Sequence, residues 1–108
     1  MNLYWGDLHN HNELGYAQGS LERSYEIARS HLDFYAFTPH GLHADGGVPD
    51  GYPVVVDNWE RIRAAAREND RPGAFTCFPA YEWHSIAWGH LHVLGLEDME
   101  EMYCARSL

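Results

Sequence analysis

Two histidines, His9 and His11, lie one residue apart directly after an apolar run near the start of the chain. In a β-strand, residues i and i+2 share a face and lie about 6.6 Å apart, so both imidazoles can reach one metal ion or a pair of ions. The same kinds of side chain follow or lie within later apolar runs, at His40, Glu82, His90 and His92. This recurrence indicates a metal site assembled from several parts of the chain.

The charge balance of the chain is acidic. It has 16 acidic residues and seven basic ones, all arginines, and its formal net charge is −9. This balance argues against a nucleic-acid surface or a polybasic membrane patch, because both need clustered positive charge. The lack of lysine also excludes a Schiff-base lysine. Bound divalent cations would offset an acidic site, although the charge alone fits an ordinary acidic soluble protein better.

Length and cysteine content limit the class of protein. With 108 residues, of which 45% are hydrophobic, we expect one globular domain over residues 1–108. Cys77 and Cys104 are far apart and form neither a CxxC metal motif nor a disulfide framework. The first residues carry no basic and apolar leader, and no apolar run approaches about 18 residues. We therefore expect a cytoplasmic protein in a reducing compartment.

Four short apolar segments predict buried strands. They cover residues 3–8, 34–38, 74–78 and 91–96. Pro39 ends the second one, and Cys77 is expected to pack within the third. The stretch 41–53, with four glycines and two prolines, predicts a long loop.

Three other segments predict helices. Ser20 is suited to cap the first helix. Its apolar stripe at helical spacing comprises Leu21, Tyr25, Ala28 and Leu32. Asp57 is suited to cap the second helix, and Gly73 closes it. The side of the second helix that we expect to be buried carries Trp59, Ile62 and Ala66. Residues 97–104 predict the start of a third, acidic helix.

The order of these elements is strand, helix, strand, long loop, helix, strand. It is typical of parallel βαβ units. The candidate ligands fall at or just beyond the ends of the first three predicted strands, which in a β/α barrel is the face that carries the active site. The sequence therefore predicts an α/β fold with a metal site at that face.

Four segments together resemble a known family. They are Gly6-Asp7-Leu8-His9-Asn10-His11, residues 32–40 ending in Thr38-Pro39-His40, Ala80-Tyr81-Glu82-Trp83, and residues 89–95, Gly-His-Leu-His-Val-Leu-Gly. In this order, they are similar to the first four motifs of the PHP (polymerase and histidinol phosphatase) superfamily. The Glu-Trp and Gly-His pairs are most similar to a branch of uncharacterised stand-alone members.

The resemblance implies a distorted seven-stranded β/α barrel that holds two or three divalent metal ions, commonly zinc, manganese or iron, and hydrolyses phosphate esters. It makes His9 and His11 the paired ligands, His40 the ligand of the second motif, and Glu82 the carboxylate that bridges metals. His40 and Glu82 are also the residues that we expect to take part in catalysis.

The fourth motif leaves two alternatives, because His90 matches a ligand in some branches of the family and His92 matches one in others. Both lie on one strand face, so one can bind metal while the other lines the site. Two positions depart from the family pattern. Pro39 stands where the family usually has the aspartate of Thr-Asp-His, and Glu13 stands near, but not at, the place of a further ligand.

Length is the largest departure. A barrel of this kind needs around 200 residues or more, and the last motifs of the family, a histidine and an Asp-x-His, have no counterpart here. We therefore expect the front half of a barrel, as a single PHP-like domain truncated at its C-terminus or as a half-barrel completed by another chain. Such a half-barrel would expose a sheet edge after the fourth strand and invite self-association.

Three further residues stand close to the candidate ligands. Asp7 is a candidate to hold the second ring nitrogen of a metal-bound His9, or else an ordinary loop carboxylate. We expect His43 and His84 to be ordinary loop residues, although His84, two residues after Glu82, is placed to contact a substrate.

These observations predict a metal-dependent hydrolase. The first hypothesis is a phosphoesterase that acts on a small phosphorylated substrate, in which a metal-activated hydroxide attacks phosphorus. A non-catalytic metal-binding fragment or interaction module without the late ligands is one alternative. A metal-dependent amidohydrolase is another, because the same hydroxide can attack carbon. No nucleic-acid or membrane partner is expected.

Overall fold

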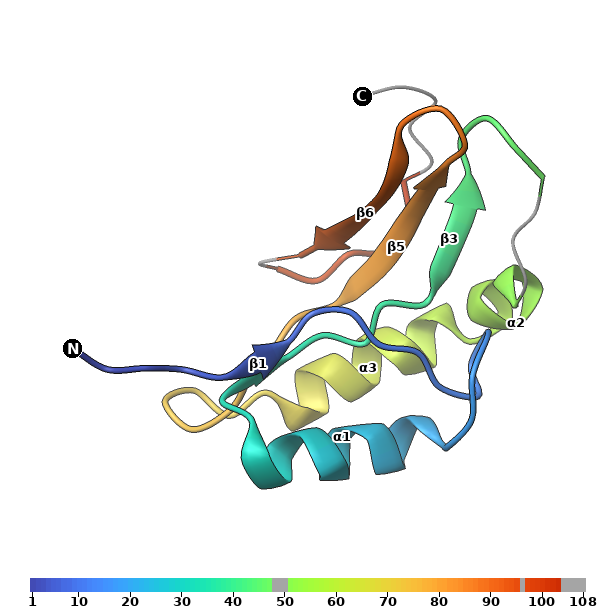
Figure 1. The fold of residues 1–108 in the computed structure, drawn as a ribbon. Coiled ribbons are helices and arrows are strands. Elements are labelled where there is room, and N and C mark those ends of the chain that lie inside the picture. The colour runs from blue at the N-terminus through green and yellow to red at the C-terminus, as the bar shows by residue number, and fades with distance from the viewer. Residues whose placement is uncertain (48–50, 96, 104–108) are drawn as a thin grey trace.

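The computed structural model describes residues 1–47, 51–95 and 97–103. They form a mixed α/β fold with three helices and two open three-stranded sheets (Figure 1). The first sheet has the order β1-β2-β4, and its strands β1 (Gly6–Asp7), β2 (Phe34–Tyr35) and β4 (Thr76–Cys77) are parallel. The second has the order β3-β5-β6. In it, β3 (His40–His43) runs parallel to β5 (Ala80–Ser85), and β6 (Gly89–Leu94) runs antiparallel to β5.

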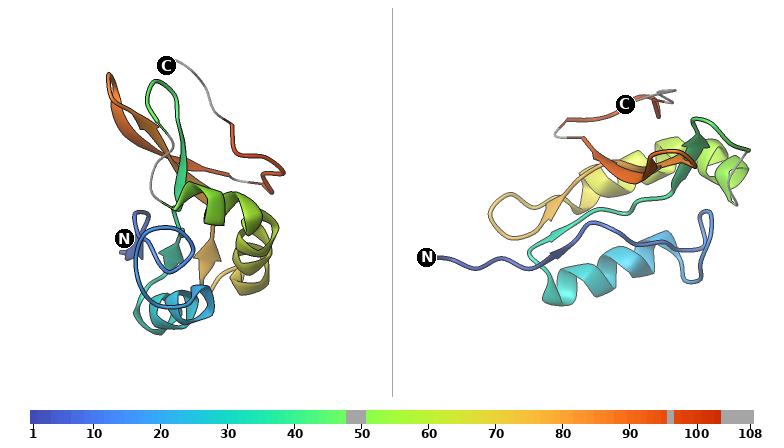
Figure 2. Two further views of the ribbon diagram at one scale, coloured as in Figure 1. Left: turned by 90° about the vertical axis from the view of Figure 1, so that its right-hand side faces the viewer. Right: turned by 45° about the horizontal axis from the view of Figure 1, so that its top comes forward.

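Helices α1 (Leu21–His31) and α3 (Trp59–Asn69) lie side by side against the parallel sheet (Figures 1 and 2). Ser20 caps α1 as predicted, because its side-chain oxygen accepts a hydrogen bond of 3.2 Å from the backbone N–H of Arg23. The predicted stripe of α1 is buried at Leu21, Tyr25 and Ala28. The βαβ alternation is therefore confirmed for the first sheet.

The prediction that Asp57 caps α3 is wrong. Asp57 is the last residue of the short helix α2 (Tyr52–Asp57), and Asn58 occupies the N-cap position of α3. Helix α2 begins within the predicted loop because Pro53 lies in its first turn, where a missing backbone N–H costs no helical hydrogen bond. Gly73 lies beyond the end of α3, in a turn with a positive φ of 81°.

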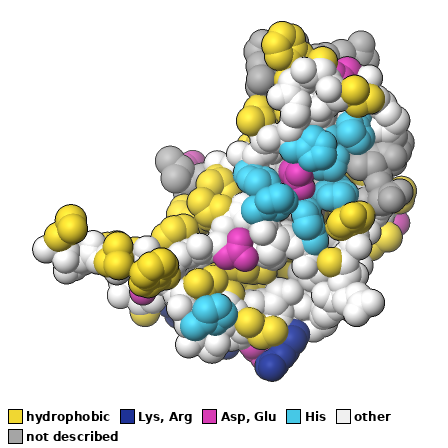
Figure 3. Space-filling view, in the orientation of Figure 1, with side chains coloured by type: hydrophobic (Ala, Val, Ile, Leu, Met, Phe, Trp, Pro, Cys, Tyr) yellow, Lys and Arg dark blue, Asp and Glu magenta, His cyan; other side chains and the backbone are white. Residues whose placement is uncertain are grey.

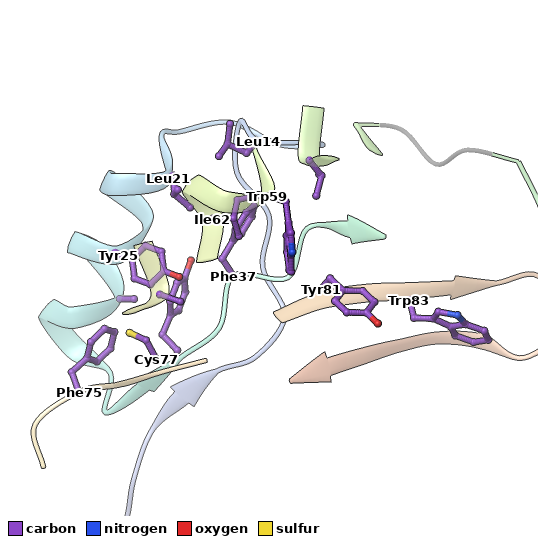
Figure 4. Close-up of a cluster of buried hydrophobic side chains, with 14 residues drawn as sticks. Leu14, Leu21, Tyr25, Phe37, Trp59, Ile62, Phe75, Cys77, Tyr81 and Trp83 are labelled. Carbon is purple, nitrogen blue, oxygen red and sulfur yellow. The ribbon is translucent and has the colours of Figure 1, made fainter. Parts of the chain in front are cut away.

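The hydrophobic core fills the space between the two long helices and the parallel sheet and extends to Tyr81 and Trp83 on β5 (Figure 4). The predicted buried side of α3 is confirmed, since Trp59, Ile62 and Ala66 are buried. Phe37 is fully buried beside them, and each such side chain contributes roughly 1.5–3 kcal/mol by leaving water. Cys77 packs in β4 as predicted.

Strands β3 and β5 are not among the predicted strands, and β3 lies mostly within the predicted loop 41–53. The two strands pair with each other although about 40 residues separate them in the sequence. The backbone N–H of Glu82 donates to the carbonyl oxygen of Pro39 at 2.8 Å, and that of Ala44 donates to the carbonyl oxygen of His84 at 2.9 Å. Pro39 itself lies where the chain passes from the first sheet to the second. Local hydrophobic patterning cannot reveal such distant pairing.

The predicted fourth strand, residues 91–96, starts earlier than expected, at Gly89. Its last predicted residue, Leu96, lies outside the described residues. The strand forms an antiparallel hairpin with β5 and is an edge of its sheet. The predicted helix 97–104 is absent from residues 97–103, and Cys104 lies outside the described residues. Asp98 accepts hydrogen bonds from Arg63 and Arg67 instead, which holds this segment against α3.

The first predicted strand, residues 3–8, is reduced to the two residues of β1. Residues 1–5 are exposed, and the chain before β1 extends outward (Figure 1), although the backbone of Trp5 still forms hydrogen bonds with Asp33 and Phe34. The described residues form two open sheets and close no barrel, so the α/β class is confirmed and the front half of a PHP-type barrel stays a prediction. None of the helices in this part of the chain has the length and apolar character that a membrane crossing requires.

Candidate metal centre

Histidine side chains gather on one face of the molecule around acidic atoms (Figure 3). The acidic side chain at the centre is Glu82, which is buried with 3% of its surface exposed. The histidines within ligand distance of it are His9, His11, His40, His84, His90 and His92. The structure thus brings together all six predicted ligands and adds His84.

The two carboxylate oxygens of Glu82 face different histidines. Its Oε2 lies 3.4 to 3.7 Å from the Nε2 atoms of His9, His11 and His40. Its Oε1 lies 2.9 Å from His90 Nδ1, which is a hydrogen bond, and 3.6 Å from His84 Nε2. Two ligands bound tetrahedrally to one zinc ion lie about 3.3–3.6 Å apart, given metal–ligand distances of about 2.0–2.2 Å. The longer separations therefore fit shared metal ligands better than hydrogen bonds.

These atoms form three groups of potential ligands that all include Glu82. The groups are His9, Glu82 and His92; His11, His40 and Glu82; and Glu82, His84 and His90. Within each group the ligand atoms lie within 4.8 Å of one another. A carboxylate has two oxygens and can therefore bridge ions, so the arrangement could bind a metal ion in any of these groups.

The register of the second sheet explains why four of these histidines converge. His40 on β3 and His92 on β6 are the cross-strand neighbours of Glu82 on β5. His90 is likewise the neighbour of His84. Because side chains directly opposite each other on one face have Cβ atoms about 4.5–5.5 Å apart, the register by itself places these rings around the carboxylate.

His9 and His11 reach the site from the loop after β1, as their position beyond the predicted strand indicates, so the strand spacing considered for the pair does not apply. Strand β1 ends at Asp7, and the two rings lie 5.2 Å apart at an angle of 85°. Asn10, between them, fixes this loop. Its side-chain amide donates to the carbonyl oxygen of Ala36 at 3.2 Å, and its side-chain oxygen accepts from the hydroxyl of Tyr35 at 2.6 Å.

The carboxylate of Asp7 accepts a hydrogen bond of 2.9 Å from the backbone N–H of His9. This contact shapes the loop that carries the histidine pair. The proposed contact of Asp7 with the second ring nitrogen of His9 stays a prediction.

Burial and the neighbouring histidines lower the pKa of three histidines of the cluster. Burial lowers the pKa of His84 to about 4, against the opposing effect of the Glu82 charge. Burial, then the neighbouring His40, also lowers the pKa of His11, and burial, then His9, lowers that of His92. Burial acts to raise the pKa of the Glu82 carboxyl, but His84 and His90 outweigh it and leave that pKa below its ordinary value. These shifts favour neutral imidazoles at His11, His84 and His92 and a charged carboxylate at Glu82, the protonation states that bind metal.

Three buried polar atoms of the cluster make no hydrogen bond. They are His11 Nδ1, Glu82 Oε2 and His84 Nε2. Leaving a buried polar atom unpaired costs about 1–3 kcal/mol. Glu82 Oε2 faces His11 Nε2, and His84 Nε2 faces Glu82 Oε1. A cation bound between either atom and the ligand that it faces would remove this cost.

Sequence reasoning underestimated His84 and His43, which it placed in loops. His84 lies in β5, two residues after Glu82 and on the same face, and His43 lies in β3 opposite His84. The spacing Glu82-x-His84 repeats the spacing of His9 and His11, and that was the available signal. It was missed because β5 itself was not predicted.

Comparisons of this chain with protein-family models, with curated proteins and with solved structures found no match. The resemblance to the PHP superfamily therefore rests on the four sequence motifs. The candidate metal centre rests on the geometry around Glu82.

Proposed function

We propose that this chain is a PHP-type, metal-dependent phosphoesterase that acts on a small phosphorylated substrate. The observation that carries the proposal is the position of Glu82, whose carboxylate belongs to all three groups of potential ligands. Metal sites that catalyse phosphoryl transfer commonly hold two ions about 3.5–4 Å apart. A shared carboxylate is a direct way to hold ions at such a separation.

Each part of the cluster has a task in this proposal. His9 and His92 form one binding group with Glu82, His11 and His40 form a second, and His84 and His90 form a third. Divalent ions such as zinc, manganese or iron, when bound, would lower the pKa of a bound water toward 7 and so supply a hydroxide at neutral pH. Imidazole ligands carry no negative charge, so much of the positive charge of bound ions would remain to attract the phosphate.

Solvent access to the cluster supports a substrate role. The side chains of His9 and His90 are 56% and 52% exposed, whereas those of His84 and Glu82 are buried. The ligands therefore range from a closed interior to an open surface. Tyr16, which is exposed and whose ring lies 4.8 Å from that of His40, is placed to contact a substrate at this surface.

Metal analysis combined with a phosphatase assay tests the proposal. The protein is purified without chelator, its zinc, manganese and iron are quantified, and hydrolysis of p-nitrophenyl phosphate is measured with added Mn²⁺. We expect two or three ions per chain and measurable turnover. Glu82→Gln should lose both, whereas Glu68→Gln, at an exposed position of α3, should keep both.

The alternatives give different results in the same experiment. Bound metal without turnover would favour a non-catalytic metal-binding module, and hydrolysis of an N-acyl amino acid but not of the phosphate ester would favour an amidohydrolase. A parent protein without metal above background would contradict the proposal.

A further inference from the structure

The ring of His84 has one nitrogen facing the carboxylate and the other facing a second histidine. His84 is buried, with 2% of its surface exposed, and its Nε2 lies 3.6 Å from Glu82 Oε1 without a hydrogen-bond partner. Its Nδ1 lies 3.4 Å from the Nε2 of His43. The ring also stacks on that of His90, with centroids 4.2 Å apart and planes 9° apart. His84 is thus held on three sides.

The presence of His43 at this place depends on an irregularity in β3. In a regular strand, residues three apart face opposite sides of the sheet. The pairing shifts between His40 and His43: His40 pairs with Glu82 and His43 with His84, so β3 advances three residues while β5 advances two. This is a β-bulge, and bulges re-aim side chains next to functional sites. As a result, the rings of His40 and His43 both contact that of His84, with centroids 4.5 and 4.8 Å away.

Gly41 makes the bulge sterically possible. A Cβ atom at this position would lie 2.9 Å from Tyr81 Cδ2 and 3.1 Å from the carbonyl oxygen of Glu82. A larger residue would therefore require the Tyr81 ring or the backbone of β3 or β5 to shift, which would disturb the approach of His43 to His84.

We infer that His43 is a positioning residue that sets the tautomer and orientation of His84, so that His84 Nε2 binds a metal ion together with Glu82 and His90. A neutral imidazole can bind metal through Nε2 only when its proton is on Nδ1, and His43 Nε2 is the acceptor placed for that proton. The inference rests on the metal-binding part of the proposed function. It does not depend on the reaction that the site catalyses.

The tautomer of His84 is directly measurable in the unmodified, zinc-loaded protein. Long-range ¹H–¹⁵N correlation spectra at constant pH distinguish Nδ1–H from Nε2–H imidazoles. We expect His84 to carry its proton on Nδ1 and to show a zinc-induced shift of Nε2. A proton on Nε2 in the loaded protein would overturn the inference.

Two variants of His43 separate positioning from packing. His43→Phe keeps a ring but removes the acceptor, and we expect it to weaken the affinity for one zinc ion by about 10–100-fold, the usual effect of losing such a partner. His43→Gln retains an acceptor oxygen and should restore most of that affinity. His31→Phe, at the exposed end of α1, is the matched control and should bind zinc as the parent does. Zinc affinity is measured by competition with a chromophoric chelator, and circular dichroism verifies that each variant is folded.

The results separate this inference from the proposed function. If the parent hydrolyses phosphate esters but His43→Phe binds every zinc ion as tightly as the parent, the inference is wrong and the proposed function stands. If the parent shows no phosphatase activity but His43→Phe loses one ion and His43→Gln regains it, the inference stands and the proposed function fails.

Discussion

His11 Nε2 lies 3.4 Å from Glu82 Oε2, and no hydrogen bond joins the two atoms. Glu82 Oε2 is buried, and leaving a buried carboxylate oxygen without a hydrogen bond is unfavourable unless another group pairs with it. The opposite oxygen of the same carboxylate, Oε1, already accepts a hydrogen bond from His90. Glu82 therefore has one satisfied and one unsatisfied oxygen, and the unsatisfied one marks where a cation is most strongly favoured.

The division of the histidines between the two oxygens predicts selective loss of metal. His11→Ala should remove the ion held with His40, and His90→Ala should remove the ion held with His84, because the two belong to different groups. Each should bind about one ion fewer than the parent, and Glu82→Ala should lose most of the bound metal. Elemental analysis of the purified variants measures the stoichiometry. Equal loss in all three variants would show that the groups do not bind separate ions.

The lowered pKa of His84 predicts that the metal-free protein is less stable in mild acid. Its pKa is about 4 when folded and near the ordinary 6.5 when unfolded, so the unfolded chain binds more protons between these values. The free energy of unfolding should therefore fall as the pH drops from 6.5 to 4, by up to about 1.4 kcal/mol per pH unit for one proton. The Glu82 carboxyl, whose pKa is lowered below 4.5, adds to the loss at the acid end.

Urea unfolding in the presence of EDTA, at several pH values between 7.5 and 4.5, checks this dependence. His84→Gln, which cannot take up a proton, should show a shallower decline than the parent. A midpoint of unfolding that stays constant from pH 7 to pH 5 in the parent would contradict the prediction.

The hydrogen bonds of Asn10 predict that it stabilises the loop of the histidine pair. Asn10→Ala removes its side-chain contacts with Ala36 and Tyr35 and should lower the free energy of unfolding by about 1–3 kcal/mol. It should also weaken metal binding, because His9 and His11 lose their fixed positions. Tyr35→Phe removes the hydrogen bond from the Tyr35 hydroxyl to Asn10 but keeps the bond from Asn10 to Ala36, and it should cost about 1 kcal/mol while leaving metal affinity near that of the parent. Urea unfolding and zinc titration measure both effects.

The open edge at β6 predicts self-association. Trp88, just before this strand, and Leu91 and Leu94, within it, are large apolar residues with 64%, 41% and 37% of their surface exposed. An unprotected, apolar strand edge can pair with the same edge of a second copy. We expect the mass measured by light scattering to rise with protein concentration and Leu91→Lys to reduce that rise. Leu3→Lys, at an exposed position far from the strand, is the control, and a parent that stays monomeric at all concentrations would contradict the prediction.

Helix α1 shows what could be predicted reliably from local pattern. Its cap, its buried stripe and its place between two parallel strands follow from residue types a few positions apart. Helix α2 and strand β3 were not predicted, because Pro53 and the glycines of 41–53 indicate a loop. In the structure, Pro53 fits the first turn of α2, and pairing with β5 stabilises β3.

The sequence by itself determined which side chains can bind metal and the order in which the chain presents them. His9, His11, His40 and Glu82 were identified from residue type and position relative to apolar runs. Only the tertiary structure decided that one carboxylate lies within reach of every group, and that His84 and His43 belong to the same cluster. The physical reason is that cross-strand register and the bulge in β3 depend on backbone pairing between segments about 40 residues apart, which no local spacing encodes.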